Sequence, residues 1–225
     1  MPVLRSAAPL VLRRTPDAVY LVGAAAGPLG GDQLSLRITV RAGACLRLRT
    51  VAASVALPGL DDAESVLAVT ATVEAGGALE YLPEPVVVAD GARHATDIRV
   101  TAGEGAWLVL RDELILGRHG ERGGSYRGRL RADYAGRPLL RQSLEVSGTD
   151  GVTAGPAVLA GHRACGLLLR AGPDVAGGAG SARPAPGADW RVAVMPLAAG
   201  PAVLVTALAD DAVTLRRRLT LRTAT

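Results

Sequence analysis

The sequence predicts a mainly β protein: a many-stranded antiparallel or mixed β scaffold, with coiled sheets or a sandwich-like arrangement, and a C-terminal α-helix. Apolar and polar residues alternate with a period of two along most of the chain, as in strands that bury one face. Glycine-rich turns separate about ten or more such segments, a spacing typical of sandwiches, coiled sheets and barrels. No strand–helix–strand alternation is visible, which argues against a Rossmann-type nucleotide site.

The alternation is clearest in Gln33–Val40 (QLSLRITV), where aliphatic residues occupy every second position. The segment CLRLRTVAASVAL repeats the pattern, with Leu46 and Leu48 set against Arg47 and Arg49. The later strand candidates are SVLAVTATVEA, ATDIRVTA, AWLVLRDELIL, SYRGRLRADY, PLLRQSLEV and AVLAGHRACGLLLR. Each is expected to bury one face and expose the other.

Residues 192–209 form an uncharged stretch that is long enough to raise the question of a membrane span. Pro196, Gly200 and Pro201 would break a helix at mid-span, so two buried strands joined by an AAGP turn are predicted instead. The apolar stretch near the N-terminus is too short for a signal peptide or a span. We therefore expect a cytoplasmic protein with no membrane partner.

Residues 209–222 (ADDAVTLRRRLTLR) are predicted to form the helix. Asp210 or Asp211 can cap its start, and Val213, Leu215 and Leu219 give a partial apolar stripe. The whole chain, 1–225, is interpreted as a single domain. It comprises a main β body over about 17–170, a loop rich in Gly, Pro and Ala at 171–189, and the strand pair plus helix at 190–225.

The net charge is +4 and the pI about 9.7, and all of the basic residues other than histidine are arginines. The arginines are mostly scattered and few aromatic residues are present to stack on bases, so no nucleic-acid partner is predicted. An acidic protein partner fits this charge equally well. Cys45 and Cys165 lack metal-ligand spacing and are expected to be two buried, reduced thiols.

The segment LEYLPEPVVV (79–88) places two glutamates among apolar residues and prolines. Pro83 and Pro85 favour an extended backbone that ends strand pairing. Glu80 and Glu84 would then lie about 13 Å apart on one face. A glycosidase pair needs roughly 5 to 9.5 Å, so these two glutamates alone do not form one.

Two polar motifs accompany this segment. In GPLGGDQL (27–34), Asp32 either closes a turn or presents an exposed carboxylate beside a flexible backbone. RDELILGRHGERGGSYRG (111–128) is interpreted as a hairpin whose tip carries solvated ion pairs. No zinc-protease or nucleophile-elbow motif is present, and His94, His119 and His162 have no evident Ser or Cys partner in the sequence.

The order of these motifs resembles the UreD (UreH) family of urease accessory proteins. GGD at 30–32, LEYLPEP at 79–85, and LGR followed by GE within 116–121 occur in the family's order, and the strand pair leading into an arginine-rich helix is also similar. The resemblance spans most of the chain and is weakest over 148–189. It implies a non-enzymatic scaffold that binds urease apoprotein and UreF, while UreF holds the GTPase UreG.

The resemblance also implies a polar passage that carries Ni²⁺ in transit, with no tightly bound cofactor. Oxygen ligands of modest affinity suit transit because a tight site would not release the ion. The residues expected along this passage or at an interface are Asp32, Glu84, Asp112, Glu113 and Glu121. The residues expected to orient them or to contact a partner are Tyr81, Pro83, Pro85, Gly117 and Arg118.

Two positions depart from the family pattern. Val51 stands where the family usually has a glutamine, and Arg141 or Gln142 stands where it often has a glutamate. If these positions line the passage, its chemistry is altered in this chain. Two rival functions stay open: a protein-interaction scaffold that never handles metal, and a β-rich hydrolase, which only the acidic clusters support.

Overall fold

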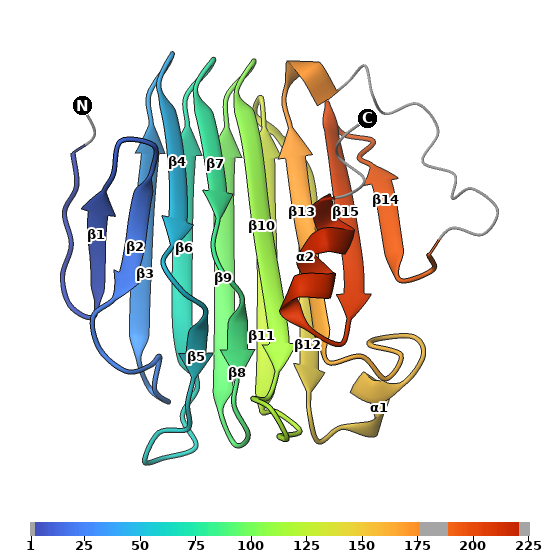
Figure 1. Ribbon diagram of the computed structural model, residues 1–225. Coiled ribbons are helices and arrows are strands. Elements are labelled where there is room, and N and C mark those ends of the chain that lie inside the picture. The colour runs from blue at the N-terminus through green and yellow to red at the C-terminus, as the bar shows by residue number, and fades with distance from the viewer. Residues whose placement is uncertain (1–2, 176–188, 221–225) are drawn as a thin grey trace.

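The computed structural model of the chain describes residues 3–175 and 189–220. Two β-sheets lie face to face, and helix α2 (Ala212–Thr220) covers the outer side of one of them (Figure 1). The chain coils between the two sheets in the manner of a solenoid. The predicted mainly β scaffold with a C-terminal helix is confirmed.

The larger sheet follows the order β1-β2-β4-β7-β10-β13-β15-β14, with β8 paired to β10 and β5 paired to β8. Its strands are β1 (Leu10–Arg14), β2 (Val19–Gly23), β4 (Cys45–Thr50), β5 (Ser54–Ala56), β7 (Ala78–Leu82), β8 (Val86–Val88), β10 (Trp107–Leu116), β13 (Ala164–Ala171), β14 (Val192–Pro196) and β15 (Ala202–Ala209). The smaller sheet follows the order β12-β11-β9-β6-β3. Its strands are β3 (Gln33–Val40), β6 (Ser65–Val73), β9 (Arg93–Ala102), β11 (Ser125–Tyr134) and β12 (Arg137–Ser147).

From β3 to β11 the chain passes back and forth between the sheets. Each return places a strand parallel to the previous strand of the same sheet, giving β3–β6–β9–β11 and β4–β7–β10. Parallel neighbours require a long crossover, and here a strand of the opposite sheet provides it. The interpretation of residues 111–128 as a hairpin is therefore wrong, because β10 and β11 belong to different sheets.

The C-terminal half of the fold is antiparallel. The turn between β11 and β12 has positive φ at both central residues, 48° at Ala135 and 75° at Gly136, the backbone pattern that matches the twist of a tight hairpin. Strands β13, β15 and β14 follow β10 as antiparallel neighbours. The strand pair predicted within residues 192–209 is thus confirmed, but the prediction that both strands are buried is wrong for β14, which lies at the edge of the sheet and has no buried residue.

Aliphatic side chains fill the space between the sheets, and each alternating strand contributes one face to this core. Leu79, Ile98, Leu108, Leu110 and Leu169 are among its most deeply buried members. Burying each such side chain contributes about 1.5 to 3 kcal/mol, so the core dominates the stability of a fold with so few aromatic residues.

A second apolar cluster joins α2 to the outer face of the larger sheet. Leu215 and Leu219 are fully buried there, whereas Val213 is 79% exposed and does not continue the predicted apolar stripe. The helix begins after Asp211, whose carboxylate accepts the Thr214 backbone N–H at 2.8 Å. The sequence did not predict the short helices α1 (Gly151–Ala154) and η1 (Pro173–Val175).

Cys165 is buried and Cys45 is exposed, and both thiols are free. The prediction that both cysteines are buried is therefore wrong for Cys45, which occupies an exposed position at the start of β4. Most of the predicted loop, residues 176–188, lies outside the described residues.

Candidate functional site

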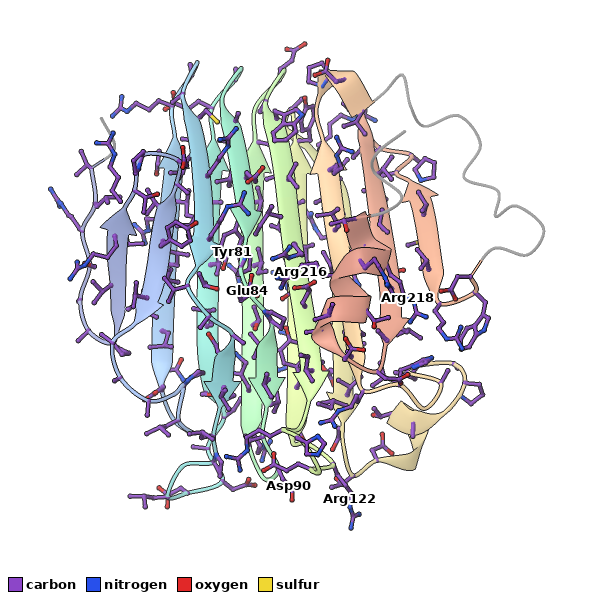
Figure 2. The ribbon with its side chains drawn as sticks, viewed as in Figure 1. Tyr81, Glu84, Asp90, Arg122, Arg216 and Arg218 are labelled. Carbon is purple, nitrogen blue, oxygen red and sulfur yellow. The ribbon has the colours of Figure 1, made fainter. Side chains whose placement is uncertain are left out.

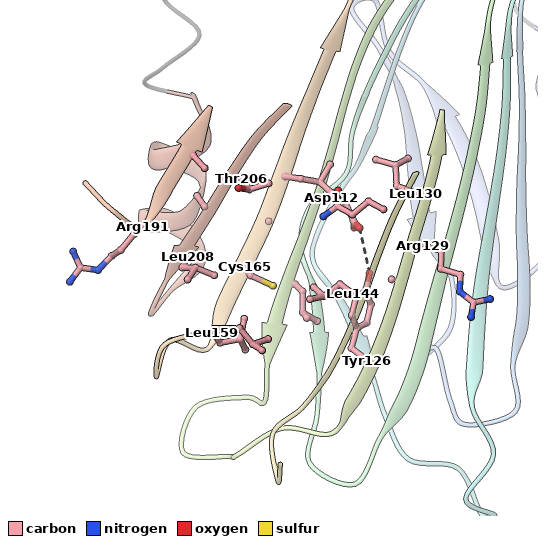
Figure 3. Close-up of a pocket in the computed structure, with 18 of the residues that line it drawn as sticks. Asp112, Tyr126, Arg129, Leu130, Leu144, Leu159, Cys165, Arg191, Thr206 and Leu208 are labelled. Carbon is pink, nitrogen blue, oxygen red and sulfur yellow. Dashed lines mark hydrogen bonds between the residues drawn. The ribbon is translucent and has the colours of Figure 1, made fainter. Parts of the chain in front are cut away.

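Asp112 lies on the inner face of β10, between the two sheets. Its carboxylate accepts a hydrogen bond from the Tyr126 hydroxyl at 3.4 Å (Figure 3). Burial raises the pKa of Asp112 to about 6; the Tyr126 hydrogen bond opposes this shift and the charge of Glu113 adds to it. Asp112 is therefore a carboxylate that can take up or release a proton close to neutral pH.

Two cavities share Asp112 as a lining residue. Cavity I, of about 330 Å³, lies between β11–β12 and β13–β15 and reaches the surface at Trp190 and Arg191. Cavity II, of about 200 Å³, lies beneath the loops around residues 25–34 and 50–54. Asp112 lines both cavities and is half-buried. This side chain thus stands where the two spaces approach each other inside the molecule.

Other polar groups face this interior. His94 and Thr96 on β9 line cavity II together with Asp112. His94 Nδ1 lies 2.9 Å from the Ser65 hydroxyl, and its Nε2 lies 3.4 Å from that of Thr96. Burial lowers the pKa of His94 to about 4, opposed by the charge of Glu64 and a backbone hydrogen bond to Ser65, so the imidazole is neutral at pH 7.

Gln142 brings an amide to cavity I from β12. Its side-chain oxygen is buried and has no hydrogen-bond partner among the described residues. A buried carbonyl oxygen without a donor is costly and is available to a visiting cation or water. Cavity I therefore offers an oxygen acceptor in addition to the Asp112 carboxylate.

Glu113 points the other way, toward the outer face of the larger sheet, and is 2% exposed. Its carboxylate pairs with Arg216 of α2 at 2.7 Å and with the buried Arg111 at 3.3 Å. Arg216 also pairs with Glu84 at 2.8 Å (Figure 2). We call Arg111, Glu113, Glu84 and Arg216 the helix-anchoring cluster because it ties α2 to β10 and to the β7–β8 connection.

The cluster also explains the prolines of LEYLPEP. Pro83 and Pro85 stand between β7 and β8, where strand pairing is interrupted. The free Pro83 carbonyl accepts the Arg111 guanidinium at 2.8 Å, and Glu84 lies at the wall of cavity II. Glu80, by contrast, pairs with Arg49. The two glutamates of this segment have different partners, so the structure gives no support to an acid/base pair.

The remaining predicted residues are distributed around this interior. Tyr81 is buried and lines cavity II, and burial raises the pKa of its hydroxyl, with the charge of Asp112 adding to the effect. Asp32 also lines cavity II and accepts the Leu29 N–H at 2.9 Å. Glu121 lies at the β10–β11 corner, where Arg118 Nε donates to it at 2.8 Å.

The same corner requires a residue without a side chain at position 117. Gly117 has a φ of 73°, and a Cβ there would lie 2.7 Å from the Glu121 carbonyl oxygen. Glu121 and Arg118 line neither cavity I nor cavity II. The structure therefore brings Asp32, Glu84 and Asp112 to cavity II. Glu113 lines neither cavity but shares Arg111 and Arg216 with Glu84, and Glu121 lies apart from both at the β10–β11 corner.

His94 and Tyr126 are interior residues that were not predicted, whereas Gln142 stands at a position where altered passage chemistry was expected. A sequence signal was present for the first two, because His94 shares the alternating inward positions of β9 with Ile98, and Tyr126 shares those of β11 with Leu130. A polar residue at an inward position of a strand is the feature that marks such groups.

Comparison with known proteins identifies the family. Residues 2–224 match the model of the UreD urease accessory protein family. A protein from Frankia alni called urease accessory protein UreD is 50% identical over 220 residues, covering 90% of this chain and 72% of that protein. Urease accessory protein UreD 3 from Streptomyces griseus is 48% identical over 228 residues, covering 97% of this chain and 87% of that protein. The chain belongs to the UreD family of urease accessory proteins.

The departures from the UreD pattern can now be placed. Val51 is 56% exposed and lines cavity II, so an aliphatic side chain stands at that wall. Gln142 lines cavity I, whereas Arg141 on the opposite face pairs with Asp133. This UreD chain thus carries an amide at the cavity wall.

None of the helices that the structure describes in this UreD chain is long and apolar enough to cross a membrane. Across residues 3–175 and 189–220, no three His, Cys, Asp or Glu side chains gather at a spacing that could hold a metal ion. Among the described residues that line cavity I, Asp112 is the only carboxylate, whereas Asp32 and Glu84 line cavity II with it.

Proposed function

We propose that this chain is a non-catalytic urease maturation factor whose interior carries Ni²⁺ toward urease apoprotein. The observation that carries the proposal is the position of Asp112, an inward-facing, half-buried carboxylate that lines both cavities. Membership of a family of urease accessory proteins supports the same role. The ion is cargo and no cofactor is held.

The chemistry of the interior suits brief contact with a divalent cation. Carboxylate, amide and hydroxyl oxygens can replace part of the water around Ni²⁺, and imidazole is a good ligand for it. Asp112, Gln142 and the neutral His94 offer these groups at separate points. Separate ligands hold the ion weakly, so it can move on.

The proposed partners are urease apoprotein and UreF, with UreG held through UreF, in the cytoplasm. The net charge of +4 favours acidic protein surfaces. A hydrolase gains little support, although Ser65 and His94 are hydrogen bonded. Ser65 is fully buried and does not line cavity II, so its hydroxyl has no access to a substrate there.

The test is urease activation in cells that co-express the urease subunits, the other accessory proteins and variants of this chain. Asp112→Asn keeps the size of the side chain and removes its charge, and we expect at least a several-fold loss of nickel in purified urease. Asp17→Asn, at the exposed β1–β2 turn, is the matched control and should leave nickel loading unchanged. Pull-down of urease should be equal for all variants.

A second pair of variants tests passage without changing charge. Leu144→Trp inserts a large ring into cavity I, whereas Ser143→Trp places the same ring on the exposed face of β12. We expect only the former to reduce nickel loading. Full loading with both Asp112→Asn and Leu144→Trp, at normal urease binding, would establish the rival scaffold that never handles metal.

A further inference from the structure

The smaller sheet ends in an unpaired strand, β3. Its even-numbered residues bond to β6, since the Asp32 and Val40 carbonyls accept the Val66 and Glu74 N–H groups at 2.8 Å each. In a parallel ladder the odd-numbered residues then direct their N–H and C=O groups to the other side. Among the described residues, Ser35, Arg37 and Thr39 have no backbone partner on that side.

A groove of about 1300 Å³ lies along this edge. The larger sheet continues past β3, so that β1 overhangs the end of the smaller sheet at the left of Figure 1. Leu10 and Leu12 of β1 and Leu36 of β3 contribute apolar walls. The groove thus combines a row of free hydrogen-bonding groups with an extension of the apolar core.

The charge of the groove has one sign. Arg5, Arg37 and Arg41 line it, and no carboxylate does. All three arginines are exposed, and none takes part in an ion pair within the described part of the chain. Unpaired arginines beside a free strand edge favour an acidic occupant.

We propose that the edge of β3 accepts an extended acidic segment of a partner protein as an added strand. Its apolar side chains would face Leu10, Leu12 and Leu36, and its alternate carboxylates would lie on the outer face beside Arg37 and Arg41. Backbone pairing supplies affinity, and the alternation of side chains supplies selectivity. This contact is separate from the passage of nickel.

A second copy of the chain is a poorer occupant. Pairing β3 with β3 would bring Arg37 and Arg41 of both copies together, and like charges across neighbouring strands are destabilising. Edge strands that carry such charges resist self-association. The same arginines that exclude a second copy therefore favour an acidic strand.

The probe is a short capped peptide of alternating glutamate and valine, labelled with a fluorophore and added to the full chain. We expect saturable binding by fluorescence anisotropy. A lysine and valine peptide of equal length should bind at least about tenfold more weakly, because its charges repel Arg37 and Arg41. An acidic peptide methylated on alternate backbone nitrogens should also lose binding, since it cannot donate to β3.

Two variants locate the site. Ser35→Pro removes an outward N–H while leaving the β6 ladder intact, and Ser35→Ala is its control. Arg37→Glu reverses the charge, and Arg131→Glu, on the outer face of β11, is its control. We expect at least about a tenfold loss for each test variant and none for its control. If Ser35→Pro fails to fold, the comparison of Arg37→Glu with Arg131→Glu tests whether the peptide binds at β3.

Three outcomes would overturn the proposal. The acidic peptide fails to bind, or binds no better than the basic one, or binds Arg37→Glu as well as the unsubstituted chain. Analytical ultracentrifugation of the chain alone tests the remaining alternative, a second copy. A dimer that Ser35→Pro dissociates would show that the edge of β3 binds another copy of the chain. None of these measurements uses nickel or urease activation. A failure of strand addition at β3 therefore leaves the proposed nickel passage intact, and a failure of the nickel passage leaves strand addition intact.

Discussion

Asp112 and Glu113 are neighbours on β10 that lie in opposite environments. Asp112 faces the cavities with a tyrosine hydroxyl as its hydrogen-bond donor, and its pKa rises to about 6. Glu113 faces outward beneath α2, where Arg111 and Arg216 both pair with it. The difference teaches that burial alone does not assign a role to a carboxylate: the number of cations beside it separates an anchoring group from a candidate ligand.

The largest effect should come from breaking the helix-anchoring cluster. Glu113→Ala leaves Arg111 buried with only Glu84 at 3.7 Å as a counter-charge. Removing one partner of a buried pair costs about 3 to 5 kcal/mol, which urea unfolding would measure. Asp62→Ala, which breaks the exposed pair with Arg93, should cost below about 1 kcal/mol.

A double variant tests the reason for that loss. In Arg111→Met with Glu113→Leu, no charge is left unpaired beneath α2, and much of the lost stability should return. A double variant as unstable as Glu113→Ala would show that the cluster stabilises by attraction and not merely by mutual compensation.

The pH dependence of stability should report the buried charge of Asp112. Its pKa rises from 3.8 to about 6 on folding, so the folded state binds more protons between these values and stability falls as pH rises. The charged form costs about 3 kcal/mol above pH 6. Asp112→Asn should therefore be more stable than the parent chain near pH 8 and equal to it near pH 3; an equal stability at both would contradict the buried charge.

His94 should act with the opposite sign. Its pKa falls from 6.5 to about 4 on folding, so the unfolded state binds more protons in this window and stability rises as pH increases. His94→Gln should lose about 3 kcal/mol of this rise between pH 4 and 7. The contributions of Asp112 and His94 to the pH dependence of stability have opposite signs and overlap between about pH 4 and 6. Asp112→Asn should therefore show the rise in unfolding free energy due to His94, and His94→Gln should show the fall due to Asp112.

The smallest expected effect concerns the reactivity of the two cysteines, one of which is exposed and the other buried. Cys45 is exposed, whereas burial, aided by the charge of Asp112, raises the pKa of Cys165 to about 12. A thiol reagent at pH 8 should modify Cys45 quickly in the folded chain and Cys165 only after unfolding. Asp112→Asn should slightly increase the slow reaction; rapid modification of Cys165 in the parent chain would show that cavity I is open to the reagent.

Much of the fold could be read from the sequence. The strands of alternating residues, the strand pair at 192–209 and the C-terminal helix are local patterns, because a strand or helix that buries one face must repeat at its own period. The prolines at 83 and 85 act on their own backbone, and strand pairing indeed stops there. These features need no knowledge of distant residues.

The partners of each strand were decided only by the tertiary structure. Alternation does not tell whether the next strand returns as a hairpin or crosses to the other sheet, so the hairpin predicted for residues 111–128 is wrong. For the same reason, the sequence could nominate Asp112 and Glu113 together but could not separate them. Their roles depend on Tyr126 and Arg216, which are distant in the chain and reach β10 only when the two sheets and α2 pack.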